Sequence, residues 1–305
     1  MNQNKGLLLV LSTAIISGAS IYVNSLAVKF GNPYVFTGLK NLLVGVAFLS
    51  LILVLKEWKS IKKLTQRQWW QLVLIGLIGG AIPFLLFFKG LSLTIAAQGS
   101  FIHKTLFIFV SFLAIAFLKE KLNKSLLIGL GALLVGNFLF LGIEPKGIGW
   151  GDGLVLLATL FWAAEVIIAK KALQKLSARL VIWGRMFFGS VFIFIFLASI
   201  GQAQAVFAYN PEQWKWVLIT SVFLFGYVFT FYHGLKYVRA SVATSVLALG
   251  APITGLITLV ANEGIVWAPQ KAGGLVLIFI GTMLVIGFKS LKSLLINKYA
   301  DAKDN

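Results

Sequence analysis

The residues most able to do chemistry in this chain are four charged side chains inside long apolar segments: Lys40, Lys104, Glu165 and Arg185. A charged group at bilayer depth costs about 2.5–3.5 kcal/mol on insertion scales, so it needs a partner or a function. Cationic side chains bind carboxylates and phosphates, and a carboxylate can exchange a proton. If all four face one cavity and His103 is neutral, the net charge of about +2 favours an anionic substrate.

Glu165 and Arg185 have the most constrained positions. Glu165 lies shortly before the end of one apolar segment, and Arg185 lies equally soon after the start of the next. Consecutive membrane helices run antiparallel, so both side chains lie at the same depth and can form an ion pair. That pair is either structural or takes part in substrate or proton handling. Glu165, the only acid inside a segment, is the candidate for proton coupling.

The other polar residues in these segments each allow two interpretations. Lys104 lies near the middle of its segment, where snorkelling is hard, whereas Lys40 can extend its charge outward to the interface. His103 is either a further ligand or a hydrogen-bonded structural residue. Three softer candidates for substrate hydrogen bonds, which helix packing explains equally well, are Tyr22, Asn24 and Trp162.

The same sequence offers little for catalysis or metal binding. It has no Cys and two His, which leaves no thiol chemistry and no cluster of zinc-ligand spacing. Membrane-embedded transferases usually carry Asp-rich or His-rich motifs, but Asp152 is the only aspartate before residue 301. No polar loop of a channel filter is present. We therefore expect no catalytic residue, no metal and no cofactor, and rank a transporter ahead of a membrane enzyme and a channel.

Composition shows which elements must position these residues. Of 305 residues, 59% are hydrophobic and 12% charged, against about 25% charged in a soluble domain. A soluble enzyme is excluded, and the expected class is an all-α integral membrane protein. One crossing takes about 20 apolar residues. We predict ten transmembrane helices, at about 6–28, 34–55, 69–91, 96–118, 125–143, 153–172, 180–201, 214–235, 242–262 and 271–290.

The third predicted span contains residues that weaken a helix. Gly76 and Gly80 permit close helix approach, and Gly79, Gly80 and Pro83 follow one another closely. Broken helices at membrane depth often mark a substrate site. We therefore predict a kink here, next to the site.

The formal net charge of +18 is a topology signal. Nineteen of the 27 basic residues fall on the side that holds both ends of a ten-span chain, five fall on the other side, and three lie inside spans. Lys and Arg concentrate in cytoplasmic loops, so both termini are predicted to be cytoplasmic. We expect a multi-pass protein of the plasma (inner) membrane whose basic loops meet lipid headgroups, with no nucleic-acid partner.

The chain contains an internal repeat. Residues 70–75 resemble residues 214–219 at an offset of 144, which also aligns Gly90 with Gly234. An offset of 145 aligns Lys40 with Arg185, and further pairs at this offset are Gly129 with Gly274 and Gly136 with Gly281. Each half holds five spans, an odd number, so the halves have inverted topology. The predicted units are residues 1–147 and 148–290, followed by a basic cytoplasmic tail at 291–305.

Short motifs accompany this repeat. Gly90 lies in a Phe-Lys-Gly-Leu run at 88–91, and Gly234 lies in a Tyr-His-Gly-Leu run at 232–235, each near the end of the third span of its half. Others are Leu-Lys-Glu-Lys-Leu at 118–122, Ala-Pro at 251–252 and Asn-Glu at 262–263. With ten spans, these motifs resemble the drug/metabolite transporter (DMT) superfamily, EamA type. Ile108 stands at the counterpart of Pro252, so a helix break is expected in the second half only.

This resemblance implies a secondary transporter that exports or exchanges small metabolites, amino acids or drugs by alternating access. With the cationic residues above, we expect amino acids or other organic anions as substrates. The alternatives are a membrane-embedded transferase and a cationic drug exporter. One chain holds both halves, so a monomer needs no partner, and the sequence does not exclude a homodimer.

Overall fold

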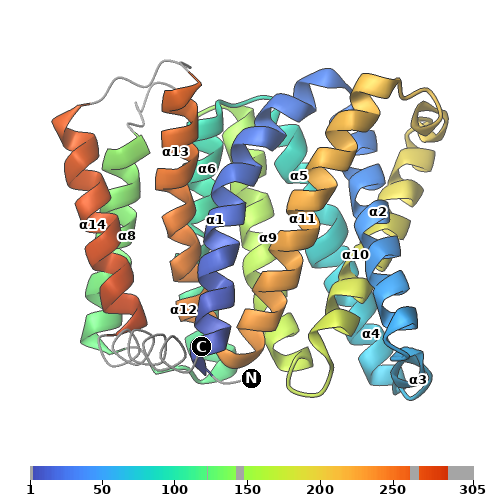
Figure 1. Ribbon diagram of the computed structural model, residues 1–305, viewed down its shortest axis with the longest axis horizontal. Helices are drawn as coiled ribbons and strands as arrows, with labels where there is room; N and C mark the ends of the chain where they lie inside the picture. Colours follow the sequence, from blue (N-terminus) through green and yellow to red (C-terminus); the bar gives the residue numbers. More distant parts are fainter. Residues whose placement is uncertain (1–2, 122, 142–147, 262–267, 288–305) are drawn as a thin grey trace, which may run out of the picture.

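A computed structural model describes residues 3–121, 123–141, 148–261 and 268–287, and these residues form helices and connecting turns (Figure 1). Asn262, Glu263 and the predicted tail at 291–305 lie outside the described residues. Ten helical stretches are long and apolar enough to cross a membrane, which confirms the predicted number. They are Gln3–Phe30, Pro33–Val54, Gln66–Leu91, Ala96–Leu118, Lys124–Leu141, Trp150–Ala172, Ala178–Ser199, Pro211–Tyr237, Ala240–Thr258 and Pro269–Ile286.

Several of these stretches consist of more than one helix. In chain order the helices are α1 (Gln3–Ala27), η1 (Val28–Phe30), α2 (Pro33–Val54), α3 (Trp58–Lys62), α4 (Gln66–Ile75), η2 (Gly76–Ala81), α5 (Ile82–Leu91), α6 (Ala96–Lys104), α7 (Leu106–Leu118), α8 (Lys124–Leu141), α9 (Trp150–Ala172), α10 (Ala178–Ser199), η3 (Ala203–Val206), α11 (Pro211–Tyr237), α12 (Ala240–Val246), η4 (Leu247–Leu249), α13 (Gly250–Val260) and α14 (Pro269–Ile286).

Polar residues at the junctions start the helices. The Asn32 side chain accepts hydrogen bonds from the first amides of α2, and Pro33 occupies the first turn, where a missing N–H costs nothing. Asn210 and Pro211 start α11 in the same way, and Thr65 starts α4 through a capping box with Gln68. Capping residues between apolar runs thus set where each span begins.

Helix pairing follows a two-fold pattern between the halves. α1 packs on α11 and α5 on α9, while α2 pairs with α10 and α8 with α14 (Figure 1). Numbering the spans from one to ten, these pairs are 1 with 8, 3 with 6, 2 with 7 and 5 with 10. If spans 1–5 are exchanged with spans 6–10 in order, the same four pairs result. Equivalent spans run in opposite directions, so the two halves form the predicted inverted repeat.

Glycines at the helix crossings obey the same symmetry. A Cβ on Gly90 would lie 2.7 Å from the Gly151 carbonyl oxygen, and one on Gly234 would lie 2.8 Å from that of Gly6. Between α8 and α14, a Cβ on Gly136 would lie 2.8 Å from the Gly274 carbonyl oxygen. Only glycine allows backbones to approach so closely. The repeated glycines of the sequence are therefore the crossing points of the helix pairs.

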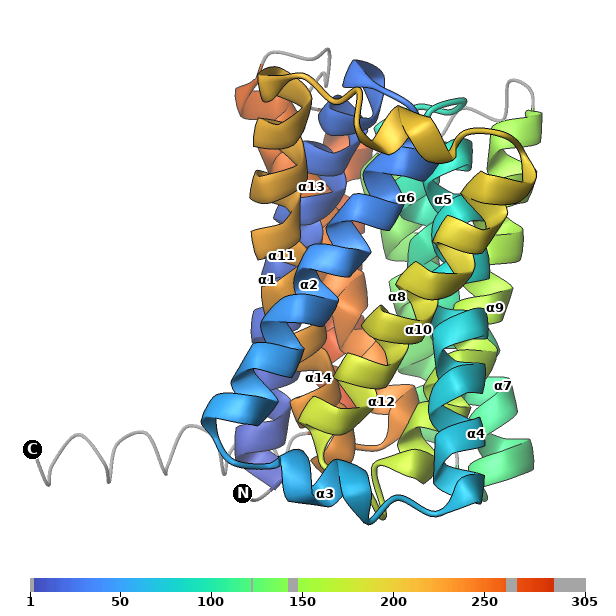
Figure 2. The ribbon, with the colours of Figure 1, turned by 90° about the vertical axis from the view of Figure 1, so that its right-hand side faces the viewer.

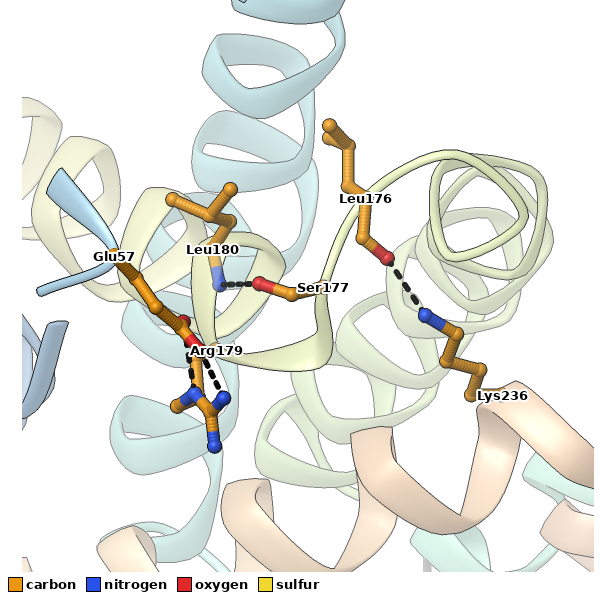
Figure 3. Close-up of polar contacts among 6 residues, drawn as sticks. All are labelled: Glu57, Leu176, Ser177, Arg179, Leu180 and Lys236. Atoms are coloured by element: carbon orange, nitrogen blue, oxygen red, sulfur yellow. Dashed lines mark hydrogen bonds and ion pairs between the residues drawn. The ribbon is translucent and has the colours of Figure 1, made fainter. Parts of the chain in front are cut away.

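The start of α1, the end of α14 and helix α3 lie on one face of the molecule, at the bottom of Figure 1 and Figure 2. Polar contacts join neighbouring elements there (Figure 3). Arg179, at the start of α10, forms an ion pair with Glu57 beside α3, with Nε 2.9 Å from Oε2. Lys236 Nζ donates a hydrogen bond of 3.2 Å to the Leu176 carbonyl. Because Glu57 and Arg179 belong to different halves, this ion pair ties the halves together.

Three spans are interrupted at depth. The third changes to a π-helix over Gly76–Ala81, which confirms the predicted distortion around Gly79 and Gly80. The ninth contains the short 3-10 helix η4. The fourth also breaks, at Thr105, so the expectation that Ile108 leaves it continuous is wrong. Thr105 Oγ1 donates to the Ile102 carbonyl at 2.6 Å, a local bond that competes with the helical pattern and needs no proline.

Candidate functional site

A cavity of about 80 Å³ lies between the halves at the level of these interruptions. Ligand pockets usually have roughly 300–1,000 Å³, so a metabolite enters only if helices move apart. The lining combines charged, aromatic and small polar side chains from seven spans. The lining residues are Ser17, Ser20, Ile21, Asn24, Lys40, Phe84, Phe87, Phe88, His103, Leu106, Trp162, Glu165, Val166, Arg185, Leu224, Tyr227, Phe231 and Tyr232.

Lys40 projects from α2 into this cavity rather than to the interface. It is 1% exposed, so the alternative of snorkelling does not hold. Its Nζ donates a hydrogen bond of 2.8 Å to Asn24 Oδ1 and lies 3.9 Å from the centre of the Phe88 ring. An amide oxygen and a ring face attract a cation without neutralising it. Among the described residues, Lys40 thus has no carboxylate partner next to the cavity.

Arg185 is held by a backbone carbonyl from the π-helix. Gly79 O accepts hydrogen bonds from Arg185 Nη2 at 2.9 Å and from Trp162 Nε1 at 3.0 Å. In an α-helix this oxygen would bond the amide four residues later, but that residue is Pro83, which has no N–H. Proline therefore frees the carbonyl, and two side chains from other spans use it. Trp162, a predicted site residue, also lines the cavity.

Glu165 lies on the other side of Gly79. The Tyr232 hydroxyl donates a hydrogen bond of 2.5 Å to Glu165 Oε1. A Cβ on Gly79 would lie 2.2 Å from Glu165 Cγ and 3.2 Å from Arg185 Nε. In the described part of the chain no direct ion pair joins Glu165 to Arg185. The expected salt bridge is thus corrected: the two charges flank one glycine, and each takes a separate neutral partner.

Of the remaining predicted site residues, some line the cavity and others lie outside it. Asn24 lines the cavity and orients Lys40, while its Nδ2 donates to Ser20. His103 also lines it, with its ring centre 5.0 Å from that of Trp162, and its buried Nδ1 has no hydrogen-bond partner. Lys104 is buried behind the wall, where Nζ donates to Ser17 Oγ at 2.8 Å. Tyr22 is half-buried and is not among the lining residues.

The cavity has the symmetry of the repeat. Lys40 and Arg185, which the offset of 145 aligns, face it from opposite halves. The offset of 144 aligns Phe88 with Tyr232, and each cation lies over its own half's ring, at 3.9 Å for Lys40 and 5.6 Å for Arg185. Tyr232 and Phe88 were missed as site residues. Their place in two aligned motifs, combined with the Lys40 and Arg185 pair, was the signal that could have found them.

Comparisons with known proteins point to one family of membrane transporters. Residues 4–142 and residues 149–287 each match the pattern of the EamA-like transporter family. The chain is 26% identical over 264 residues to the riboflavin transporter ImpX of Fusobacterium nucleatum, covering 80% of this chain and 85% of that protein. It is 25% identical over 261 residues to the uncharacterized transporter YetK of Bacillus subtilis, covering 80% and 76% respectively.

An uncharacterized transporter of Archaeoglobus fulgidus is 25% identical over 241 residues, which cover 76% of this chain and 80% of that protein. Among solved structures, one crystal structure superposes with a TM-score of 0.69 at 17% identity, covering 93% of this chain and 96% of the other. That likeness concerns the fold alone. The sequence matches, by contrast, extend over both halves of the cavity.

Proposed function

Since the chain belongs to the EamA-like transporter family and is a multi-pass membrane transporter, we propose that it moves small organic anions by alternating access. Substrates of this class include amino acids, through their carboxylate, and aromatic carboxylates. We propose transport outward, as an exporter or exchanger. The observation that carries the substrate class is the pair of cations at the cavity, Lys40 and Arg185, against the single carboxylate Glu165.

The chemistry of the wall narrows the class further. Lys40 has no carboxylate partner in the described part of the chain, so a substrate carboxylate can pair with it as Asn24 now does. The unpartnered Nδ1 of His103 is available to a polar group. Phe84, Phe87 and Trp162 offer ring faces close by, which favours substrates with an aromatic or planar part. The relative named as a riboflavin transporter is compatible with this preference.

We place the moving parts in the two halves, residues 1–147 and 148–290. Inverted halves can form inward-open and outward-open states of similar energy, and a substrate shifts the population between them. The small cavity fits a state closed on both sides. Glu165 with its Tyr232 hydrogen bond is the proposed proton-coupling group, because it is the one carboxylate among the described residues that line the cavity. Lys104 is a positioning residue that fixes Ser17.

The proposed setting is the cell (inner) membrane with both termini cytoplasmic. The described chain ends and α3 share one face, and the basic residues concentrate on that face. The protein acts without an enzymatic step, and a monomer holds the complete cavity.

The test is an uptake screen with the purified full chain in liposomes. Labelled amino acids, aromatic carboxylates and cationic drugs are compared with and without a pH gradient. We expect saturable uptake of anions that unlabelled anions inhibit. Preference for cationic drugs would refute the anion site, and uptake indifferent to the gradient would remove Glu165 as the coupling residue.

A further inference from the structure

A second, larger cavity opens on the face that carries α3. It has a volume of about 730 Å³, within the usual range of ligand pockets, and is separate from the central cavity. Its walls come from the start of α4 and the end of α7 in the first half, and from the ends of α9 and α11 in the second. We define this basic cleft by six cationic side chains: Arg67, Lys119, Lys170, Lys171, Lys175 and Arg239.

Only part of the positive charge of the basic cleft is compensated from within. Lys170 donates hydrogen bonds to the Leu235 and Val238 carbonyls, and Arg239 donates one to the Lys121 carbonyl. The one carboxylate of the cleft, Glu120, is fully engaged at the start of α12, where it accepts from the Ala240 amide at 2.7 Å and the Ser241 hydroxyl at 2.5 Å. In the described part of the chain, the ion pairs lie elsewhere. Lys171 and Lys175 are exposed, and neither forms an ion pair with a described acidic residue. An anion entering the cleft therefore meets several unpaired cations at once.

The five-helix fold does not itself require basic residues at the positions of the basic cleft, because the equivalent positions of the other half are not basic. The offset of 145 places Glu212 at the counterpart of Arg67 and Leu26 at the counterpart of Lys171. Phe30 stands at the counterpart of Lys175. A cytoplasmic excess of Lys and Arg accounts for their number on this face, but it does not explain why they converge from several spans on one cavity.

An apolar wall stands beside the cations. Phe117, 58% exposed, and Tyr237, 38% exposed, lie in the same cleft at the ends of spans four and eight. Lys171 Nζ lies 5.5 Å from the Phe117 ring centre. The neighbouring amides of Gln68 and Gln174 can donate to phosphate oxygens. This combination suits a phosphate group, either on a lipid with an acyl chain along Phe117 or free in solution.

We propose that the basic cleft is a binding site for an anionic phosphate group that bridges the two halves. Arg67 and Lys119 belong to the first half, and Lys171 and Lys175 to the second. A phosphate bound to both pairs holds the halves together on this face. Any movement that separates them loses those contacts, so the bound anion favours the state closed on this side.

The test measures binding, not transport, so it stands apart from the proposed substrate. The purified full chain is titrated in detergent with dioleoylphosphatidylglycerol, with the net-neutral dioleoylphosphatidylcholine, and with inorganic phosphate, and occupancy is read by native mass spectrometry. The double variant Lys171→Gln/Lys175→Gln is compared with a control, the double variant Lys62→Gln/Lys63→Gln. Lys62 and Lys63 are exposed on the same face but lie outside the cleft. Circular dichroism verifies that both variants fold.

We expect phosphatidylglycerol to bind and the cleft pair of substitutions to weaken it about 30-fold, since each lysine near an anionic lipid contributes roughly fivefold. The control pair changes it little. Competition by inorganic phosphate would identify free phosphate as the ligand, and its failure to compete would identify the lipid. Equal losses in both variants, no loss in either, or equal binding of phosphatidylcholine would overturn the proposal.

Discussion

The sharpest prediction compares two buried lysines that differ in what they face. Lys40 is 1% and Lys104 3% exposed, and each Nζ donates one hydrogen bond of 2.8 Å to a neutral side chain. Lys40 lines the central cavity, whereas Lys104 lies behind its wall. Lys40→Met and Lys104→Met therefore remove equally buried charges, but only the first removes a charge that a substrate can contact.

The two effects of Lys40→Met have opposite signs. Loss of the charged hydrogen bond to Asn24 costs about 1.5–3 kcal/mol, and loss of the contact with the Phe88 ring costs up to about 2 kcal/mol. Removal of a charge from membrane depth stabilises the protein by about 2.5–3.5 kcal/mol. These contributions nearly cancel, so the free energy of unfolding should change by at most about 2.5 kcal/mol in either direction.

Substrate binding has no such compensation. A hydrogen bond between Lys40 and a substrate carboxylate contributes about 1.5–3 kcal/mol, so Lys40→Met should weaken anion binding about 10- to 150-fold. Lys104→Met should weaken it by no more than about threefold, because Lys104 acts only through the Ser17 hydroxyl that it positions. The assay is competition against labelled anion uptake in liposomes, with thermal unfolding measured in parallel. Equal losses of affinity in both variants, or unchanged affinity in Lys40→Met, would refute the reasoning.

Three further predictions concern packing, coupling and topology. Gly136→Ala places a Cβ 2.8 Å from the Gly274 carbonyl oxygen and should destabilise the protein by about 1–3 kcal/mol in thermal unfolding; Gly131→Ala, with nothing within 4 Å, should cause no loss. Glu165→Gln keeps an oxygen for its tyrosine partner but should abolish stimulation of uptake by a pH gradient, and full stimulation in this variant would contradict that role. The chain has no native Cys, so single cysteines report topology cleanly: a membrane-impermeant thiol reagent added outside should label Phe207→Cys but not Lys62→Cys, and the reverse pattern would invert the proposed orientation.

Most of the fold was predictable because bilayer thickness fixes the length and composition of each span. The repeat was visible because crossing points demand glycine, so Gly129, Gly136 and their aligned partners survive as a pattern in sequence. The break at Thr105 was missed. It rests on a hydroxyl bond within one turn of helix, which residue type alone does not distinguish from an ordinary helical threonine.

The site was predictable in its charges and not in its contacts. Depth along a span could be read from the sequence, which selected Lys40, Lys104 and Arg185, but the direction in which a side chain points depends on helix rotation. The role of the Gly79 carbonyl leaves almost no trace in sequence, since the group belongs to the backbone. Its one trace is Pro83, four residues later, which removes the amide that would otherwise occupy it.

The most direct measurement is counterflow in liposomes that contain the purified chain and are preloaded with an unlabelled anion identified by the uptake screen. An alternating-access site between the halves predicts saturable entry of the labelled anion that the preloaded anion accelerates. It also predicts loss of this exchange when Lys40 and Arg185 are both replaced by Met. Flux that rises linearly with concentration, ignores the preloaded anion and survives this double substitution would contradict a shared central site.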